Sequence, residues 1–181
     1  MKEYIEKNLK TEIIGKNIIF FDEIDSTQEK AKQLAEGKVE NGTIILANKQ
    51  TNGIGTHGRK WYTKEDDSIA FTIILYPKGG IESLKDLTID IAVCMVDTIE
   101  ELYGIKLDIK KPNDLMCHQK KVGGILTQIT TVRRENKIFI NWNGNECEYC
   151  SISSRVGRNR YFFKKRVWTR VFKRKNHLQV L

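Results

Sequence analysis

The fold of this chain is decided by the stretch Asn48-Lys49-Gln50-Thr51-Asn52-Gly53-Ile54-Gly55-Thr56-His57-Gly58-Arg59-Lys60-Trp61. Its three glycines lack a Cβ atom, so the backbone of this loop can approach a bound anion closely. Glycines with this spacing also occur in dinucleotide sites, in kinase loops and in ordinary turns. The residues on either side of the loop must therefore decide its role.

Both flanks of the glycine loop are apolar runs of strand type. Residues 43–47 precede the loop and residues 68–75 follow it. We therefore expect the loop to connect two strands. A dinucleotide-binding fold would instead start a helix inside the glycines, with the helix N-terminus facing the phosphates. The flanks argue against that fold.

Length and composition favour a single domain. A chain of 181 residues can bury one good core, and no run approaches the roughly 18 apolar residues of a membrane span. The N-terminus lacks the apolar segment of a secretion signal, so we expect a soluble, cytoplasmic protein with no membrane partner. Cys147 and Cys150 form a single Cys-x-x-Cys without a second pair, so no metal site is expected, and a redox pair is the alternative.

The net charge of +8 is concentrated at one end of the chain. Residues 151–181 contain ten Lys or Arg and no Asp or Glu, which leaves 21 basic and 23 acidic residues in the first 150. The basic character is thus a property of the tail. Because residues 1–16 are too short for a helix-turn-helix module, no specific DNA binding is expected.

A short strand and a capped helix are predicted at the start of the core. Residues 17–24 form an apolar strand-like run, and Ser26-Thr27 precede a helix-forming segment at residues 29–36. Ser26 and Thr27 have two interpretations. They cap the helix, or they offer polar groups to a ligand at the helix N-terminus, and both can hold together.

The middle of the chain predicts a long helix followed by several short strands. Apolar residues recur near helical spacing over residues 82–103, and Gly104 ends the segment. Residues 105–110, 115–117 and 122–129 read as strands, with a turn at 111–114 and a tight connection at 118–121. The expected class is α+β: a mixed or antiparallel sheet with helices on one face.

Four motifs follow one another along this framework. They are Asp25-Ser26-Thr27-Gln28, Gln50 through Trp61, Lys110-Lys111-Pro112-Asn113-Asp114, and Lys121-Val122-Gly123-Gly124-Ile125-Leu126. Together they resemble the catalytic domain of the biotin protein ligases over residues 17–130. The resemblance implies the class II synthetase-like fold of the biotin/lipoate ligase catalytic domains.

The resemblance also implies a reaction. Such enzymes use ATP and Mg²⁺ to convert biotin to biotinyl-5′-AMP, and then transfer biotin to a lysine of a biotin carboxyl-carrier protein. Two negatively charged reactants must meet in the first step, so a cation beside them stabilises the transition state. The resemblance leaves a homodimer open.

Site residues follow from the resemblance, motif by motif. Lys121 would contact the biotin carboxylate and the α-phosphate, with Lys110 and Asp114 near the acyl transfer and the metal-bound nucleotide. Biotin would be bound by Ser26, Thr27, Gln28, Gln50 and Gly123, together with Lys121. The adenylate would be bound by Gly53, Ile54, Gly55, Thr56, Gly58, Arg59, Trp61 and Asn113.

Several of these residues also have ordinary structural explanations. Lys110 is alternatively a solvated charge at a strand end, Asn113-Asp114 a plain turn, and Trp61 a packing residue. The sequence departs from the family pattern at Thr56, where an arginine that grips the adenylate is usual, and at Lys111, where a tryptophan is usual. We therefore expect the loop to hold the adenylate loosely.

The C-terminal part does not continue the family pattern. We expect the catalytic domain to span residues 1–136 and to be incomplete, with a basic, poorly folded tail at 137–181. Read one base later, permitted codons for residues 141–149 spell T-G-M-G-M-N-V-N, which resembles the missing family motif, so we infer a change of reading frame near residues 131–138. The alternative is a genuine nucleic-acid-binding extension, since ten cations are interleaved with aromatic residues.

Two rival functions remain on sequence grounds. A lipoate ligase or octanoyl transferase has the same architecture and also transfers an acyl group to a lysine. A noncatalytic basic nucleic-acid-binding protein comes from a different class. The complete glycine loop and the Lys-x-x-Gly-Ile-Leu match favour biotin.

Overall fold

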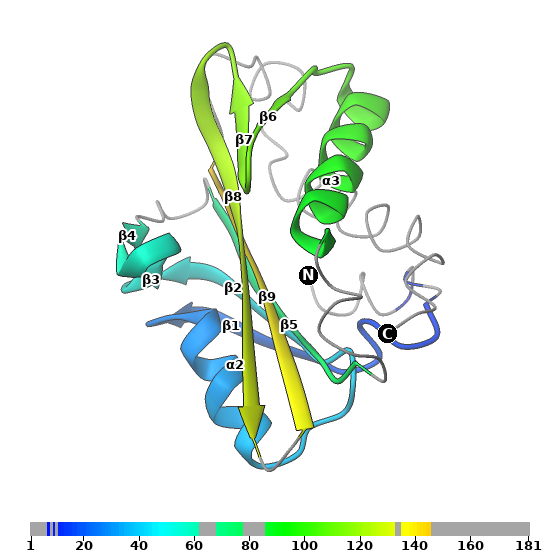
Figure 1. Cartoon of the computed structure of the whole chain (residues 1–181), viewed down its shortest axis with the longest axis vertical. Coiled ribbons are helices and arrows are strands. Elements are labelled where there is room, and N and C mark those ends of the chain that lie inside the picture. Colours follow the sequence, from blue (N-terminus) through cyan, green and yellow to red (C-terminus); the bar gives the residue numbers. More distant parts are fainter. Residues whose placement is uncertain are drawn as a thin grey trace.

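A central sheet dominates the computed structural model, which describes residues 7, 9, 11–61, 68–77, 86–132 and 135–145. Within these residues seven strands form one sheet in the order β1-β2-β5-β9-β8-β7-β6 (Figure 1). Their bounds are β1 Ile18–Ile24, β2 Ile44–Gln50, β5 Ser68–Leu75, β6 Asp108–Lys110, β7 Asp114–Cys117, β8 Lys120–Val132 and β9 Glu135–Asn145.

The sheet is mixed, as the sequence predicts. β1 and β2 are parallel because helix α2 (Thr27–Glu36) connects them, whereas every other pair in this sheet is antiparallel. The strand predicted at residues 68–75 has those bounds in the structure. A two-residue turn with φ of 45° at His118 and 65° at Gln119 joins β7 to β8, within the predicted tight connection.

Ser26 starts α2. Its backbone is extended and its Oγ accepts a hydrogen bond from the backbone N–H of Glu29 at 3.4 Å, so the expected N-cap is confirmed. The helix begins at Thr27, two residues before the predicted start. Its Ala31 and Ala35 are buried against β2, β5 and β9, in a cluster with Ile45, Ile74 and Phe139.

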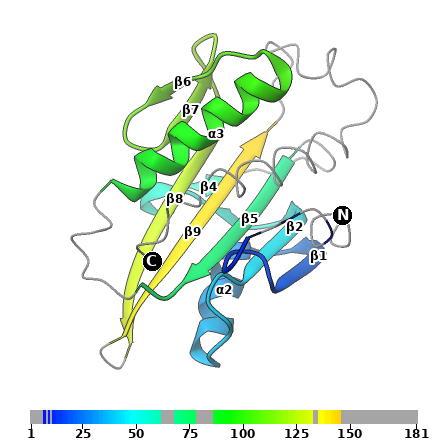
Figure 2. The same ribbon diagram turned by 90° about the vertical axis from the view of Figure 1, so that its right-hand side faces the viewer.

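Helix α3 (Leu87–Tyr103) covers the other face of the sheet. It ends where Gly104 adopts a left-handed φ of 64°, as predicted. Ile73 of β5 belongs to the core under α3, whereas the next residue, Ile74, belongs to the core under α2. Successive strand residues point to opposite faces, so the two helices lie on opposite sides of the sheet (Figure 2). The expectation of helices on one face is therefore wrong, because the apolar run of β5 is buried on both faces.

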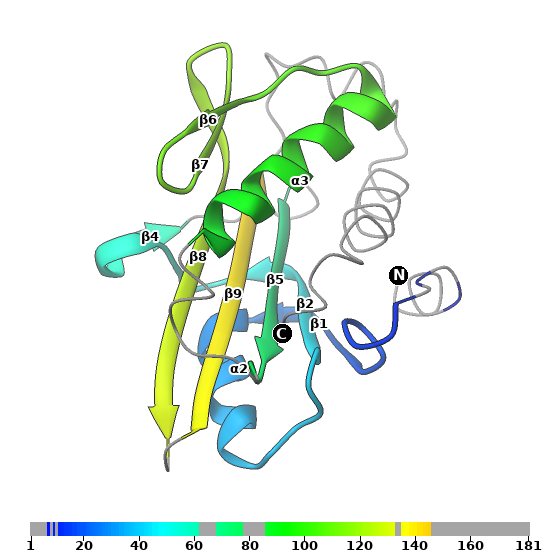
Figure 3. The same ribbon diagram turned by 45° about the vertical axis from the view of Figure 1, so that its right-hand side comes forward.

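β9 corrects the expected domain boundary. Residues 137–145, assigned above to the tail, form most of this strand, which lies between β5 and β8 (Figure 3). Ile138, Ile140 and Trp142 fill the core under α3, and Phe139 fills the core under α2. A boundary at residue 136 is wrong because it would remove a central strand that packs on both faces.

Other expectations fall where the structure gives no description. The Cys147-Cys150 pair and the basic segment at 151–181 lie outside the described residues, as does the predicted start of the long helix at residue 82. Neither described helix is long and apolar enough to cross a membrane.

Candidate functional site

The glycine loop forms a small hairpin beside the sheet. β3 (Gly53–Ile54) pairs with β4 (Lys60–Trp61), and a single 3-10 turn, η1 (Thr56–Gly58), joins them (Figure 1). Gly53 must be glycine here, because a Cβ would lie 2.7 Å from the carbonyl oxygen of Trp61 and 3.0 Å from Nε2 of Gln50. The hairpin is thus packed directly against the side chain of Gln50.

Gln50 belongs to a buried network of hydrogen bonds at the N-terminus of α2. Its Oε1 accepts from the backbone N–H of Thr27 at 2.8 Å and from the Thr27 hydroxyl at 2.9 Å. Its Nε2 donates to Oδ1 of Asn143 on β9 at 2.7 Å. All three residues are at most 3% exposed. β2, α2 and β9 therefore meet at one polar point inside the molecule.

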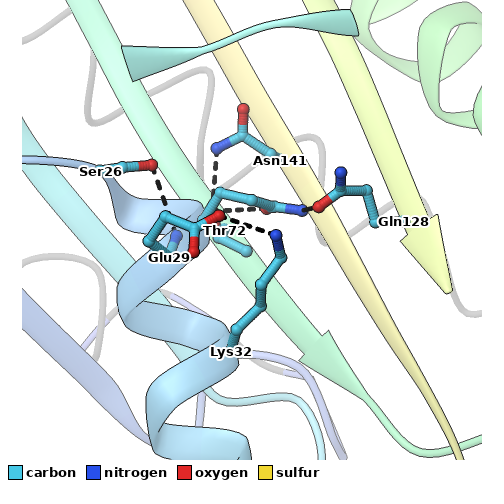
Figure 4. Close-up of polar contacts among 7 residues, drawn as sticks. Ser26, Glu29, Lys32, Thr72, Gln128 and Asn141 are labelled. Atoms are coloured by element: carbon cyan, nitrogen blue, oxygen red, sulfur yellow. Dashed lines mark hydrogen bonds and ion pairs between the residues drawn. The ribbon is translucent and has the colours of Figure 1, made fainter. Parts of the chain in front are cut away.

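The same network continues across the sheet through Asn141 (Figure 4). The Nδ2 of Asn141 lies 3.0 Å from the Thr27 hydroxyl, 2.9 Å from the Thr72 hydroxyl and 3.1 Å from the carbonyl oxygen of Phe71, so its two hydrogens are shared among three acceptors. Its Oδ1 accepts from Asn143 at 2.6 Å. Gln28 accepts from Thr72 at 3.2 Å and donates to Gln128 of β8 at 2.9 Å. Hydroxyls and carboxamides make up the network, so it is polar but uncharged.

A second, charged cluster lies where β7 and β8 begin. Nζ of Lys121 is 2.7 Å from Oδ1 of Asp114 and 5.0 Å from the ring centroid of Trp61, the last residue of the hairpin. The ion pair is partly exposed, with the lysine side chain at 38% and the aspartate at 24%. A cation is thus held between a carboxylate and an aromatic face at the rim of the site.

Two glycines join the uncharged network to the charged cluster. Gly53 lies between Gln50 and Trp61, whose ring contacts Lys121. Gly124 pairs with Asn143 across β8 and β9, and a Cβ on Gly124 would lie 3.4 Å from Nζ of Lys121. Gln50 and the Lys121–Asp114 pair therefore lie at one site.

The turn before β7 is fixed by its asparagine. Nδ2 of Asn113 donates to the carbonyl oxygen of Ile125 at 3.0 Å, and the N–H of Ile125 donates back to the carbonyl oxygen of Asn113 at 2.9 Å. This exchange anchors the turn to β8 and so places Asp114 beside Lys121. Lys110 ends β6 as an exposed residue directly opposite Asp114.

Not every predicted residue faces this site. Gly123 points away from Lys121, because a Cβ there would lie 2.3 Å from Cη2 of Trp142 in the core under α3. The neighbouring Gly124 is the glycine that lies beside Lys121. On the hairpin, Gly58 and Arg59 are exposed, whereas Ile54, Gly55 and Thr56 are half-buried.

Sequence reasoning missed four members of the network: Thr72, Gln128, Asn141 and Asn143. A signal for two of them is present, since Asn141 and Asn143 alternate with the apolar Ile140 and Trp142, and a strand with this pattern places both amides on one face. Thr72 and Gln128 stand in apolar strands with nothing local to distinguish them.

Few of the described side chains at this site could act as ligands of a metal ion. Across the described residues there is no group of three His, Cys, Asp or Glu side chains that would hold a metal ion. Asp114 is the carboxylate beside Lys121, and one of its oxygens already faces that lysine. This donor set fits a magnesium ion that is bound mainly by phosphate oxygens, with at most one carboxylate from the protein.

Comparisons with known proteins agree with this site. The sequence pattern of the Biotin/lipoate A/B protein ligase family matches residues 20–145. The bifunctional ligase/repressor BirA of Bacillus subtilis is 40% identical over 125 residues, which are 69% of this chain and 38% of that protein. The biotin–[acetyl-CoA-carboxylase] ligase of Paracoccus denitrificans is 34% identical over 106 residues, covering 58% of this chain and 43% of that protein.

A solved structure gives the same answer for the fold. The biotin protein ligase of Aquifex aeolicus, in complex with biotin and ATP, superimposes with a TM-score of 0.66 at 26% identity, covering 87% of this chain and 69% of that one. The chain thus spans well under half the length of the two curated relatives. The family match covers more than half of the chain and extends to the end of β9. The chain belongs to the Biotin/lipoate A/B protein ligase family.

Proposed function

We propose that this chain is an ATP-dependent biotin–protein ligase catalytic domain. The observation that carries the proposal is the junction of a buried, uncharged hydrogen-bonding network with a partly exposed lysine at one site. The network suits the polar ring of biotin, and the lysine suits its carboxylate. Family membership and the biotin-bound relative support the same reaction.

Lys121 would act on the first step. A carboxylate oxygen of biotin attacks the α-phosphorus of ATP, the new P–O bond forms, and pyrophosphate leaves. Both reactants are anions, so a cation between them lowers their repulsion and stabilises the charge that gathers in the transition state. Lys121 is suited to this because its ammonium group is compact and reaches solvent.

Asp114 and Trp61 would position that lysine. The carboxylate of Asp114 lies 2.7 Å from the ammonium, whose Nζ is 5.0 Å from the centroid of the Trp61 ring. An incoming anion would share or replace Asp114 as the partner of Lys121. Magnesium, bound chiefly by ATP phosphates, would add further positive charge at this point.

The uncharged network would select the acid. Ser26, Thr27, Gln28 and Gln50 present hydroxyl and amide groups that match the C=O and N–H groups of a ureido ring. The dithiolane ring of lipoate has neither, so it would leave buried polar groups without partners, which costs about 1–3 kcal/mol for each group. Biotin is therefore the preferred acid.

The glycine hairpin would cover the adenylate and exclude water from the mixed anhydride. Arg59 is exposed at its tip, where it would reach phosphate oxygens. In the second step, the amine of a lysine on a biotin carboxyl-carrier protein attacks the acyl carbon and AMP leaves. We further propose a cytoplasmic location, where ATP and carrier are available.

The test is pyrophosphate release by the purified chain with ATP, Mg²⁺ and biotin. Pyrophosphate release that requires both ATP and biotin supports the proposal. Lipoate, tested in place of biotin, is the control substrate for the rival lipoate ligase activity. Release with lipoate but not with biotin would instead identify a lipoate ligase. No release with either acid, from a chain that melts cooperatively, would contradict both activities.

A further inference from the structure

Three side-chain amides link two backbone groups of fixed polarity in the buried network. At one end stands the N–H of Thr27, which can only donate, and at the other the carbonyl oxygen of Phe71, which can only accept. Neither group can rotate to change its role. The amides between them must therefore all point in a compatible direction.

The hydrogen bonds along this path run in a single sense. Thr27 N–H donates to Oε1 of Gln50 at 2.8 Å, and Nε2 of Gln50 donates to Oδ1 of Asn143 at 2.7 Å. Nδ2 of Asn143 donates to Oδ1 of Asn141 at 2.6 Å, and Nδ2 of Asn141 donates to Phe71 O at 3.1 Å. Reversing any one amide would set two donors or two acceptors face to face.

We propose that Asn143 is a positioning residue that fixes the orientation of Gln50 and so decides which kind of ligand atom Gln50 binds. Both lone pairs of Oε1 are used by Thr27, and one hydrogen of Nε2 is used by Asn143. The capacity left to Gln50 is one N–H donor. A ligand atom that reaches Gln50 must then be an acceptor, such as the carbonyl oxygen of a ureido or amide group.

Asn143 can fix this orientation because the orientation of its own amide is fixed by Asn141. Its Nδ2 is committed to Asn141, which is in turn committed to the Phe71 carbonyl, so Oδ1 is left to face Gln50. Asn143 is 3% exposed, which leaves little water to satisfy a reversed amide. The ligand part of this proposal rests on the proposed function, whereas the orientation of Gln50 does not.

A double-mutant cycle between Gln50→Glu and Asn143→Ala tests the proposal. Above its pKa the new carboxylate can still accept from Thr27, but its second oxygen faces Oδ1 of Asn143 and cannot donate. Asn143→Ala removes that opposing acceptor. If Asn143 fixes Gln50, the loss of biotin affinity caused by Gln50→Glu at pH 8 is at least about threefold smaller in the Asn143→Ala background.

The pH profile adds a readout that a purely structural role would not change. Burial raises the pKa of a carboxyl group, so the introduced group gains a proton as the pH falls and can then donate to Asn143. The free energy of unfolding of Gln50→Glu without ligand, measured in urea, should therefore rise as the pH falls from 8 to 5. This rise should be smaller in the Asn143→Ala background, where no acceptor opposes the carboxylate. Biotin affinity should recover only in part, because the single O–H cannot serve both Asn143 and the ligand.

The matched control is Asn136→Ala. Asn136 lies on the same strand, but its Oδ1 accepts from the exposed Thr131 hydroxyl and does not contact Gln50. The cycle between Gln50→Glu and Asn136→Ala should be additive. If Gln50→Glu does not fold, Gln50→Met takes its place, because its thioether cannot donate to Asn143 and is only a weak acceptor. The same threefold threshold then applies to the loss of biotin affinity.

Urea unfolding of the same four proteins without ligand separates the two proposals. Non-additive unfolding in a chain that does not bind biotin would support the fixed amide and overturn the proposed function. Additive unfolding would overturn the role of Asn143, even in a chain that binds biotin. If the loss of biotin affinity caused by Gln50→Glu differs by less than about threefold between the two backgrounds, the role of Asn143 is likewise overturned.

Discussion

The two clusters that meet at the glycine hairpin differ in exposure and in charge. The network around Gln50 and Asn141 is neutral and almost completely buried, whereas the Lys121–Asp114 pair is charged and partly open to solvent. Buried neutral groups give direction and selectivity, because each unpaired atom is costly. A half-exposed ion pair contributes little to stability but can exchange its partner for a substrate anion. Substitutions in the two clusters should therefore separate activity from stability.

Lys121→Met should give the largest effect, and it should be on activity. Removing a cation that stabilises transition-state charge is expected to lower the rate of biotin-dependent pyrophosphate release by about 100- to 1,000-fold. The free energy of unfolding should change by less than about 1 kcal/mol, because exposed ion pairs contribute little. Steady-state kinetics and urea unfolding measure the two quantities.

Lys32→Met is the matched control for this comparison. Lys32 forms an ion pair of the same length, 2.7 Å, with Glu29 on the surface of α2. Its loss should leave both the rate and the stability nearly unchanged. Equal losses of activity in the two variants would mean that Lys121 is one surface charge among others.

Gly53→Ala should disturb the contact between the hairpin and the network. The new Cβ meets the Trp61 carbonyl at 2.7 Å and Gln50 at 3.0 Å, so backbone must move, which costs about 2 kcal/mol of unfolding free energy. Gly58→Ala is the control, since nothing lies within 4 Å of its Cβ position and only its positive φ of 72° opposes the change. The control should lose about 1 kcal/mol. Equal losses in urea unfolding would argue against the packed hairpin.

Thr72→Val should affect stability more than chemistry. The hydroxyl of Thr72 is fully buried, donates within the network and accepts from Asn141, so a methyl group in its place leaves polar partners unsatisfied. We expect a loss of about 1.5 kcal/mol in urea unfolding. Thr131→Val removes an exposed hydroxyl and should cost less than about 0.5 kcal/mol. A neutral Thr72→Val would show that water satisfies the network.

Thr56→Arg should give the smallest effect, on the lifetime of the bound adenylate. An arginine at the start of η1 can pair with phosphate oxygens, and about a threefold slower release of biotinyl-5′-AMP is expected from a partly exposed contact of this kind. Thr56→Gln adds length without charge and is the control. An unchanged dissociation rate in rapid-mixing experiments would reject the idea that this loop holds the adenylate loosely.

Features set by neighbouring residues were predictable from the sequence. Ser26 as the cap of α2, Gly104 as the end of α3 and the bounds of β5 depend on local chemistry, and the structure confirms all three. The family motifs also identified Lys121 and Asp114, which the structure brings together. Their roles in catalysis stay predictions.

Features set by distant residues were not predictable. Asn143 and Gln50 are 93 positions apart in the sequence, and Asn141 and Thr27 are 114 positions apart. No local sequence pattern therefore predicts the hydrogen bonds between them. The face of the sheet that each helix covers depends on packing against β5, whose residues are distant in the sequence from most of the helix residues. By contrast, the sequence does distinguish Gly124 from Gly123, because Gly124 is the glycine of the Lys-x-x-Gly-Ile-Leu motif. The change of reading frame inferred near residues 131–138 stays a prediction, and it conflicts with β9, whose side chains fill both cores up to Trp142 in the frame of this chain.

The position of β9 has a consequence for how the molecule folds. It is the last described strand in the chain, yet it alone joins the group β1-β2-β5 to the group β8-β7-β6. During synthesis from the N-terminus, these groups cannot be joined into one sheet until residue 145 has left the ribosome. Their open edges are exposed in that interval, and pairings between distant segments form slowly. Newly made chains should therefore be most prone to aggregation before this strand is inserted.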